Sequence, residues 1–298
     1  MSTPDKAWAK EARAQDSRVT SLRSAYSRVP QPRTLLAFDV GNTNIVIGIF
    51  CEGSLIQRWR VSTEKNRSAD EYAVLMAQLL DFVDMEFEYI QGAVISSVVP
   101  PATPALEVML RDYIGVAPLV IGPGTKTGLP IQCYNPREVG ADRIVNAVAG
   151  LAKYGAPLII IDFGTATTFC ALNEKGEYMG GAIAPGIAIS SEALFQGASK
   201  LPRVDLANPG SVIGRDTVSS MQAGIYYGFC GQAEKIVSLM TGALIQQGLG
   251  DVEKIQVVAT GGIAALMAES CSAIDMVDED LTLEGLRILY EKNTLNAV

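Results

Sequence analysis

The chain contains the same short pattern twice: Asp162 lies 123 residues after Asp39, and Gly164 lies 123 residues after Gly41. Each copy has an apolar run rich in β-branched residues, an Asp-x-Gly loop, a second apolar run and a polar turn typical of a hairpin. One Asp-x-Gly loop occurs often by chance, whereas two at matching places in matched β contexts indicate an internal duplication. The duplication predicts two similar lobes with a cleft between their loops.

The segments after the first copy alternate between helix and strand patterns. Ser68 and Glu71 have the spacing of a capping box, and apolar residues at helical period follow them. Further strands are expected over residues 92–99 and 118–121, with a helix over residues 104–113 between them. This alternation predicts an α/β protein.

We divide the chain into three parts. The first lobe covers residues 34–154 and the second covers residues 155–298. Residues 1–33 carry seven Lys/Arg against three Asp/Glu and little apolar periodicity. They are interpreted as a poorly ordered N-terminal extension, with a mis-assigned start or a weak transit-like segment as alternatives.

The composition excludes several classes of protein. The sequence has no histidine, which excludes Ser-His-Asp catalysis and His-ligated zinc, so carboxylates must carry any proton transfer. The net charge of −8 argues against general binding of nucleic acid or of anionic membranes. No run reaches the ~18 apolar residues of a membrane span. The five scattered cysteines lack a C-x-x-C pair, which favours reduced thiols in a cytoplasmic protein.

The first loop, residues 39–44, suits the phosphates of a nucleotide. Gly41 permits a turn whose N–H groups approach an anion, and Asn42 and Thr43 add neutral donors. Asp39 can hold Mg²⁺ directly or through water. The structural alternative is an Asx turn in which Asp39 caps the backbone of its own loop. The P-loop pattern and a convincing dinucleotide fingerprint are both absent.

The second lobe carries three further glycine-containing segments. Residues 162–168 should face the first loop across the cleft and bind phosphate or a cation. The glycines of residues 180–186 either permit close approach of two backbones or form a flexible turn. Residues 255–267 predict a strand, a Gly-Gly turn and the start of a helix, which can receive a phosphate or a nucleoside.

A helix pattern between the two lobes begins near Gly140 and places Asp142 in its first turn, next to Arg143. The structural interpretation is an acid set against the helix dipole, with Arg143 as its local partner. The functional interpretation follows from the neighbouring loops. In phosphoryl transfer, a carboxylate that accepts the hydroxyl proton and an arginine that fixes an anionic substrate would complete a small-molecule kinase.

Several motifs in one order resemble type III pantothenate kinases, members of the acetate and sugar kinase/Hsp70/actin superfamily. They occupy residues 39–44, 66–71, 140–143, 162–167, 180–186, 201–202, 214–217 and 260–262. The resemblance covers about residues 35–293, and the family pattern lacks the N-terminal extension. It implies two duplicated ribonuclease H-like (actin-like ATPase) lobes. It also implies ATP-dependent phosphorylation of pantothenate, the first step of coenzyme A biosynthesis.

The resemblance gives a role to each matching position. Asp142 would accept the proton of the pantothenate hydroxyl, and Asp162 would coordinate a monovalent cation, K⁺ or NH₄⁺. Asp39 would reach the Mg²⁺ that comes with ATP. The residues implied in ATP binding are Asp39, Val40, Gly41, Asn42, Thr43, Asn44, Ile45, Val46 and Thr165. The residues implied in pantothenate binding are Tyr134, Gly140, Ala141, Asp142, Arg143 and Thr217.

The resemblance further implies a homodimer in which Thr217 reaches the pantothenate of the partner subunit. The family usually has Asn before that threonine, whereas this chain has Asp216, an extra carboxylate near an anionic substrate. Residues 217–248 are helical in composition and contain glycines at intervals of three and four. This pattern fits a helix at a dimer interface and equally a kinked helix within one chain.

Two other functions remain open. A sibling kinase of the same superfamily would phosphorylate another small hydroxyl or carboxylate substrate. A regulatory protein would bind nucleotide without turnover, because fold alone does not fix function. The presence of both Asp142 and Arg143 beside the loops argues against the second, since a switch needs no proton acceptor for a substrate.

Overall fold

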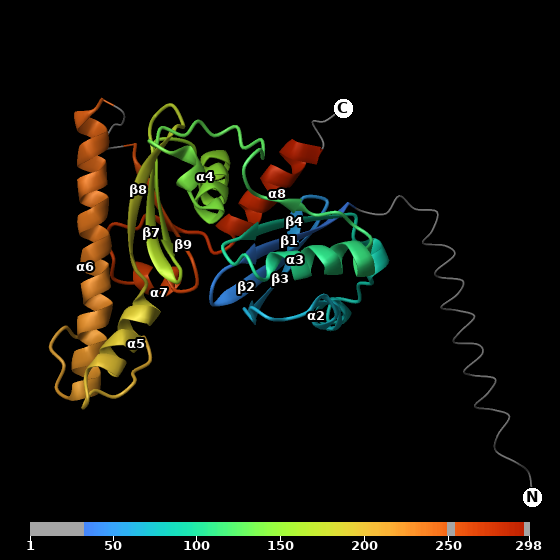
Figure 1. Ribbon diagram of the computed structural model, residues 1–298. Helices are drawn as coiled ribbons and strands as arrows, with labels where there is room; N and C mark the ends of the chain where they lie inside the picture. Colours follow the sequence, from blue (N-terminus) through green and yellow to red (C-terminus); the bar gives the residue numbers. More distant parts are fainter. Residues whose placement is uncertain (1–32, 249–253, 295–298) are drawn as a thin grey trace, which may run out of the picture.

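The structure is a computed structural model that describes residues 33–248 and 254–294 (Figure 1). The extension predicted over residues 1–33 lies outside these ranges except for Arg33. The chain forms two five-stranded mixed sheets with helices on their faces. Within the described ranges, none of the helices has the length and apolar character needed to cross a membrane.

The two sheets have the same topology. The first contains β1 (Thr34–Val40), β2 (Asn44–Cys51), β3 (Ser54–Ser62), β4 (Gly92–Ser97) and β5 (Leu119–Val120), in the order β3-β2-β1-β4-β5. The second contains β6 (Leu158–Phe163), β7 (Ala166–Leu172), β8 (Tyr178–Pro185), β9 (Gln256–Thr260) and β10 (Met276–Val277), in the order β10-β9-β6-β7-β8. In both, the first strand pairs antiparallel to the second and parallel to the fourth. The predicted duplication and the two-lobed α/β fold are confirmed.

The helices and sheets form five layers (Figure 1). The described helices are α2 (Ala69–Asp81), α3 (Thr103–Met109), α4 (Ala141–Tyr154), α5 (Ile187–Gly197), α6 (Thr217–Gln246), α7 (Ala264–Ala268) and α8 (Leu281–Thr294), with short 3₁₀ turns at Phe87–Tyr89 and Pro136–Glu138. Helices α2 and α3 cover the outer face of the first sheet, and α6 and α7 cover the outer face of the second. Helices α4 and α8 lie between the sheets: α4 packs against both of them, and α8 packs against the first sheet and against α4.

Three apolar cores hold these layers together. The central core joins Val94 of the first sheet, Val145 of α4, Ile160 of the second sheet and Leu286 of α8. Because α4 packs on both sheets and α8 packs on α4, the sheets cannot separate without exposing this core. The N-terminal end of α4 is therefore fixed between the two Asp-x-Gly loops.

Local sequence signals account for where several helices begin and end. The capping box of α2 is present, because the Ser68 hydroxyl accepts from the Glu71 N–H and the Glu71 carboxylate accepts from the Ser68 N–H. The helix predicted over residues 104–113 is α3 followed by a π-helical turn over Leu110–Ile114. Gly115, at φ +84°, ends it in the left-handed conformation that glycine adopts without strain.

The glycines of residues 180–186 lie in β8 and at the start of α5, not in a flexible turn. A Cβ atom on Gly181 would lie 1.7 Å from the carbonyl oxygen of Phe169, and one on Gly186 would lie 2.2 Å from that of Thr165. The prediction of close backbone approach is confirmed at both positions, and the alternative of a flexible turn is wrong.

Candidate active site

The two Asp-x-Gly loops meet at their tips, as predicted. The hydroxyl oxygens of Thr43 and Thr165 lie 3.1 Å apart. In the first loop the Gly41 N–H donates to the Asn44 carbonyl at 3.0 Å, and in the second the Gly164 N–H donates to the Ala166 carbonyl at 3.1 Å. Both loops are therefore tight turns, although the second is one residue shorter than the first, and the turns face each other across the lobes.

Two hydrogen bonds from Thr63, which follows β3, hold the first loop in place. The Thr63 hydroxyl donates to the Gly41 carbonyl at 2.6 Å, and its N–H donates to the Thr43 carbonyl at 3.0 Å. Asn42 and Thr43 are exposed at the tip. The side chains of Val40 and Ile45 are fully buried in the outer core of the first sheet, so these two positions offer a nucleotide only backbone groups.

Three carboxylates converge at the loops. Burial, together with the negative charges of Asp162 and Asp142, raises the pKa of Asp39 to about 7. Burial and the charge of Asp142 raise the pKa of Asp162 to about 6, although the amide of Asn146 opposes this by donating to its carboxylate at 3.1 Å. A site of this kind favours a bound cation, because a positive charge relieves the repulsion among the carboxylates.

Metal ions fit this site only with help from another ligand. Among the described residues, no three acidic, cysteine or histidine side chains are close enough to hold a metal ion by themselves. Carboxylate oxygens are nevertheless the ligand type that Mg²⁺ prefers, and Mg²⁺ is usually bound through one or two of them together with phosphate oxygens. Asp39 therefore fits a Mg²⁺ ion that arrives with a nucleotide.

Asp142 lies in the first turn of α4, which begins after Gly140. A Cβ atom on Gly140 would lie 2.4 Å from the Asp142 Oδ1 atom. Gly140 therefore leaves the space that the carboxylate occupies. Ala141 and Asp142 are both half-buried, so the carboxylate is partly accessible.

The Arg143 side chain reaches the second sheet. Its Nε donates to the Cys170 Sγ at 3.3 Å and its Nη2 donates to the Phe169 carbonyl at 3.3 Å. The guanidinium also lies over the Tyr178 ring, 5.8 Å from its centroid. No carboxylate in the described ranges forms an ion pair with Arg143. The expected partnership of Arg143 with Asp142 is therefore not a direct ion pair, and the guanidinium is left available to an anion.

Asn146 is a site residue that sequence reasoning missed. It is buried, at 2% exposure, and its amide joins Asp162 to the Thr282 hydroxyl, which donates to the Asn146 Oδ1 at 2.7 Å. The sequence contains a signal for this role, because Asn146 interrupts the apolar face of the predicted helix. A buried amide in such a place requires hydrogen-bond partners.

Arg60 of β3 is a second missed residue. It pairs with Val46 across β2 and β3, at the end of the predicted ATP loop. A Cβ atom on Gly262 would lie 3.0 Å from the Arg60 Nη1, so this cation of the first lobe reaches the Gly-Gly turn of the second. Its neighbour Arg58 forms ion pairs with Glu279 and Asp280.

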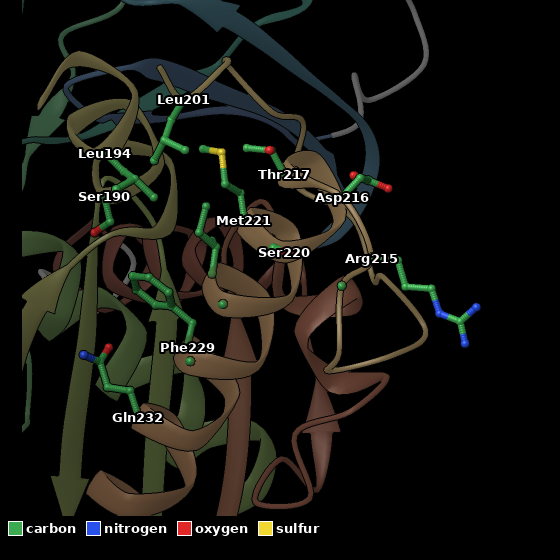
Figure 2. A pocket seen from close by; sticks show the side chains of 14 residues that line it. Ser190, Leu194, Leu201, Arg215, Asp216, Thr217, Ser220, Met221, Phe229 and Gln232 are labelled. Atoms are coloured by element: carbon green, nitrogen blue, oxygen red, sulfur yellow. The ribbon is translucent and has the colours of Figure 1, made fainter. Parts of the chain in front are cut away.

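Two predicted site residues lie apart from this cluster. The Tyr134 side chain is fully exposed in the loop before α4. Thr217 begins α6, which covers the opposite face of the second sheet from α4 (Figure 1). It lines a cavity of about 920 Å³ with Leu201, Met221 and Phe229 (Figure 2). Within one chain, the structure therefore does not join Thr217 to Asp142.

Asp216, the departure from the expected asparagine, caps α6. Its carboxylate accepts from the Ser219 N–H at 2.8 Å, and this hydrogen bond holds the pKa of Asp216 below its ordinary value. Asp and Asn are equally good in this capping role. The substitution therefore keeps the start of the helix intact.

Comparison with known proteins decides the family. The sequence pattern of the type III pantothenate kinases matches residues 35–239. The chain belongs to the type III pantothenate kinase family. A relative of that name from Geobacter sulfurreducens is 57% identical over 259 residues, which cover 87% of this chain and 99% of the relative. Another, from Bacillus cytotoxicus, is 54% identical over 261 residues, which cover 88% of this chain and 97% of the relative.

Among solved structures, the chain is similar to a conserved putative Baf family transcriptional activator from Campylobacter jejuni. It is 17% identical, with a TM-score of 0.49, over 87% of this chain and 98% of that chain. The matches to the two family relatives extend over nearly the whole length of each relative. The type III pantothenate kinase assignment therefore covers both lobes.

Proposed function

We propose that this pantothenate kinase transfers the γ-phosphoryl group of ATP to the hydroxyl of pantothenate, the first step of coenzyme A biosynthesis, with Asp142 as proton acceptor. The observation that carries this proposal is the convergence of Asp142 on Asp39 and Asp162 at the meeting point of the two loops. Phosphoryl transfer needs positioning and charge stabilisation more than covalent help from the protein. A partly accessible carboxylate beside a nucleotide site supplies the remaining proton transfer.

The loop over residues 39–46 and Thr165 would hold ATP. Exposed N–H and hydroxyl groups at the tip, Asn42 and Thr43 among them, donate to phosphate oxygens. Asp39 would reach Mg²⁺ bound to those phosphates. Mg²⁺ neutralises the charge that develops on the transferred group.

Pantothenate would bind at the start of α4. Its carboxylate pairs with the free N–H groups of Arg143, while Gly140 and Ala141 provide close backbone contact. Tyr134, exposed in the loop just before α4, would close over the substrate. The five cysteines are all free thiols, which fits the reducing cytoplasm.

A substrate panel tests the proposed function. Purified protein with ATP and Mg²⁺ is expected to give a far higher kcat/KM with pantothenate than with other small hydroxyl or carboxylate compounds. A higher kcat/KM with another compound would favour a sibling kinase. Nucleotide binding with no turnover of any compound would favour the regulatory alternative.

We also propose that Asp162 binds a monovalent cation. Its carboxylate is buried and is oriented by Asn146, while the neighbouring negative charges favour a counter-ion. Pantothenate phosphorylation is expected to run several-fold faster in K⁺ or NH₄⁺ than in Na⁺. The Asp162→Asn variant is expected to lose this difference, as measured by initial rates at constant ionic strength. Equal wild-type rates in all three salts would contradict the assignment.

A homodimer through α6 is the remaining part of the proposal. Gly224, Gly228 and Gly231 face open space, since an added Cβ atom would contact nothing within 4 Å. Large apolar side chains are exposed nearby, among them Ile213 at 76% and Leu239 at 59%. A second copy packed against this surface would also bring its Thr217 to the pantothenate site of the first copy.

The Gly228→Arg variant tests the dimer. The protomer has room for the side chain, so the fold is expected to survive, whereas the charged side chain would block contact between two copies. Analytical ultracentrifugation is expected to give a dimer for the wild type and a monomer for the variant. Gly122→Arg, which also enters open space but lies in the first lobe, is the control. A variant that remains as dimeric as the control would remove α6 from the interface.

A further inference from the structure

The substrate arginine is held by residues of the second sheet and not by its own helix. Arg143 projects from α4 to β7, where its Nε donates to the Cys170 Sγ and its Nη2 to the Phe169 carbonyl, both at 3.3 Å. The Arg143 guanidinium carbon lies over the ring of Tyr178 in β8, 5.8 Å from the ring centroid, in a cation–π contact. These three contacts come from neighbouring strands of one sheet, so they fix the guanidinium relative to that sheet.

Cys170 and Tyr178 form a buried pair. Cys170 is 2% exposed and Tyr178 is fully buried, and the Sγ and the phenol oxygen lie 3.5 Å apart. Burial raises the pKa of the Cys170 thiol, so the sulfur stays neutral when it accepts from Arg143. A neutral acceptor orients the guanidinium without cancelling the charge that an anionic substrate needs.

Gly181 of β8 leaves the space that the Nη2 end of the guanidinium needs beside the Phe169 carbonyl. A Cβ atom there would lie 2.7 Å from the Arg143 Nη2 and 1.7 Å from the Phe169 carbonyl oxygen. The guanidinium therefore lies against the backbone of Phe169 and Gly181 and against the Cys170 thiol. Of its five N–H donors, Nε and one of Nη2 point to the sheet, which leaves the Nη1 group and one Nη2 proton for a ligand.

We propose that Cys170 and Tyr178 are positioning residues, which hold Arg143 so that its free N–H groups meet the carboxylate of the substrate. This rests on the proposed function, in which Arg143 binds pantothenate. Their side-chain hydrogen bonds and ring contact described above are with Arg143 and with each other. Their influence is confined to the affinity for the carboxylate-bearing substrate.

The test compares Cys170→Ala with Cys170→Ser. Alanine removes the acceptor for Nε and is expected to raise the KM for pantothenate about five- to tenfold, the usual effect of losing one hydrogen bond. The KM for ATP and the kcat at saturating pantothenate are expected to stay unchanged. Serine keeps an acceptor at the same place and is expected to restore the KM to within about twofold of the wild type.

Two further variants separate positioning from general damage. Cys271→Ala removes another buried cysteine, in the outer core of the second sheet, and is expected to leave the KM for pantothenate unchanged. Tyr178→Phe keeps the ring under the guanidinium but removes the contact with Cys170, and is expected to raise the KM less than Cys170→Ala does. Pantothenate binding measured by calorimetry should weaken in the same order.

The outcomes are distinct. If the wild type phosphorylates pantothenate and Cys170→Ala keeps the wild-type KM, the positioning role is overturned while the proposed function stands. A parallel rise in the KM for ATP, or no rescue by serine, also overturns it, because the effect would then be structural. If the wild type does not phosphorylate pantothenate at all, the proposed function fails and the positioning role fails with it.

Discussion

Replacing Asp142 with asparagine should abolish pantothenate phosphorylation while the protein still folds. Asparagine fills almost the same space at the start of α4 but cannot accept the proton of the substrate hydroxyl. Loss of a general base costs about 10²–10⁴-fold in kcat. The change also removes one of the charges that raise the pKa values of Asp39 and Asp162, so the variant should be no less stable than the wild type.

The measurement is a coupled assay of ADP release, with far-ultraviolet circular dichroism and a thermal melt to establish the fold. Asp112→Asn, an exposed acid of the first lobe, is the matched control and should keep full activity. Near-normal kcat in a folded Asp142→Asn protein would exclude this carboxylate as the proton acceptor. Tight nucleotide binding should persist in the variant, because the loops themselves are unchanged.

Replacing Asp39 with asparagine should stabilise the ligand-free protein and eliminate its activity. The folded protein binds the Asp39 proton more tightly than the unfolded chain does, since the pKa rises from 3.8 to about 7. Between these values the folded state binds more protons, so stability falls as the pH rises through this window. Asparagine is neutral throughout and should raise the free energy of unfolding by about 2–4 kcal/mol at pH 8.

The increase in the free energy of unfolding caused by Asp39→Asn should nearly vanish near pH 4. At that pH the Asp39 carboxyl of the wild type is protonated in the folded state and only partly ionised in the unfolded chain. Urea denaturation at pH 4 and pH 8, without nucleotide, Mg²⁺ or K⁺, measures both values for variant and wild type. Asp112→Asn again serves as the control. A stability difference that does not grow with pH would show that Asp39 is not held at a raised pKa. Such a trade of stability for function is common at active sites.

The duplication and the two loops could be predicted because they depend on local signals. Consecutive residues carry the signals for a strand, an Asp-x-Gly turn and a returning strand. The copy at Asp162 shows which of these features recur. The duplication also predicts that the two loops face each other, and the contact between Thr43 and Thr165 confirms it. Gly181 and Gly186 likewise carried a visible signal of close backbone approach.

The direction of Arg143 could not be predicted, because it depends on packing between distant elements. The sequence places it beside Asp142, and a local pair is the simplest expectation. The side chain instead extends to Cys170, which is 27 residues away and carries no charge that would mark it as a partner. The place of Thr217 depends on how two chains assemble, which the residues of one helix do not specify.

The most direct test is detection of the product itself. The purified protein is incubated with ATP, Mg²⁺, K⁺ and pantothenate, and the mixture is analysed by mass spectrometry. The wild type is expected to form 4'-phosphopantothenate and ADP in equal amounts, and Asp142→Asn is expected to form neither. ATP binding without formation of phosphopantothenate, under conditions where the wild type is folded, would contradict the proposed function.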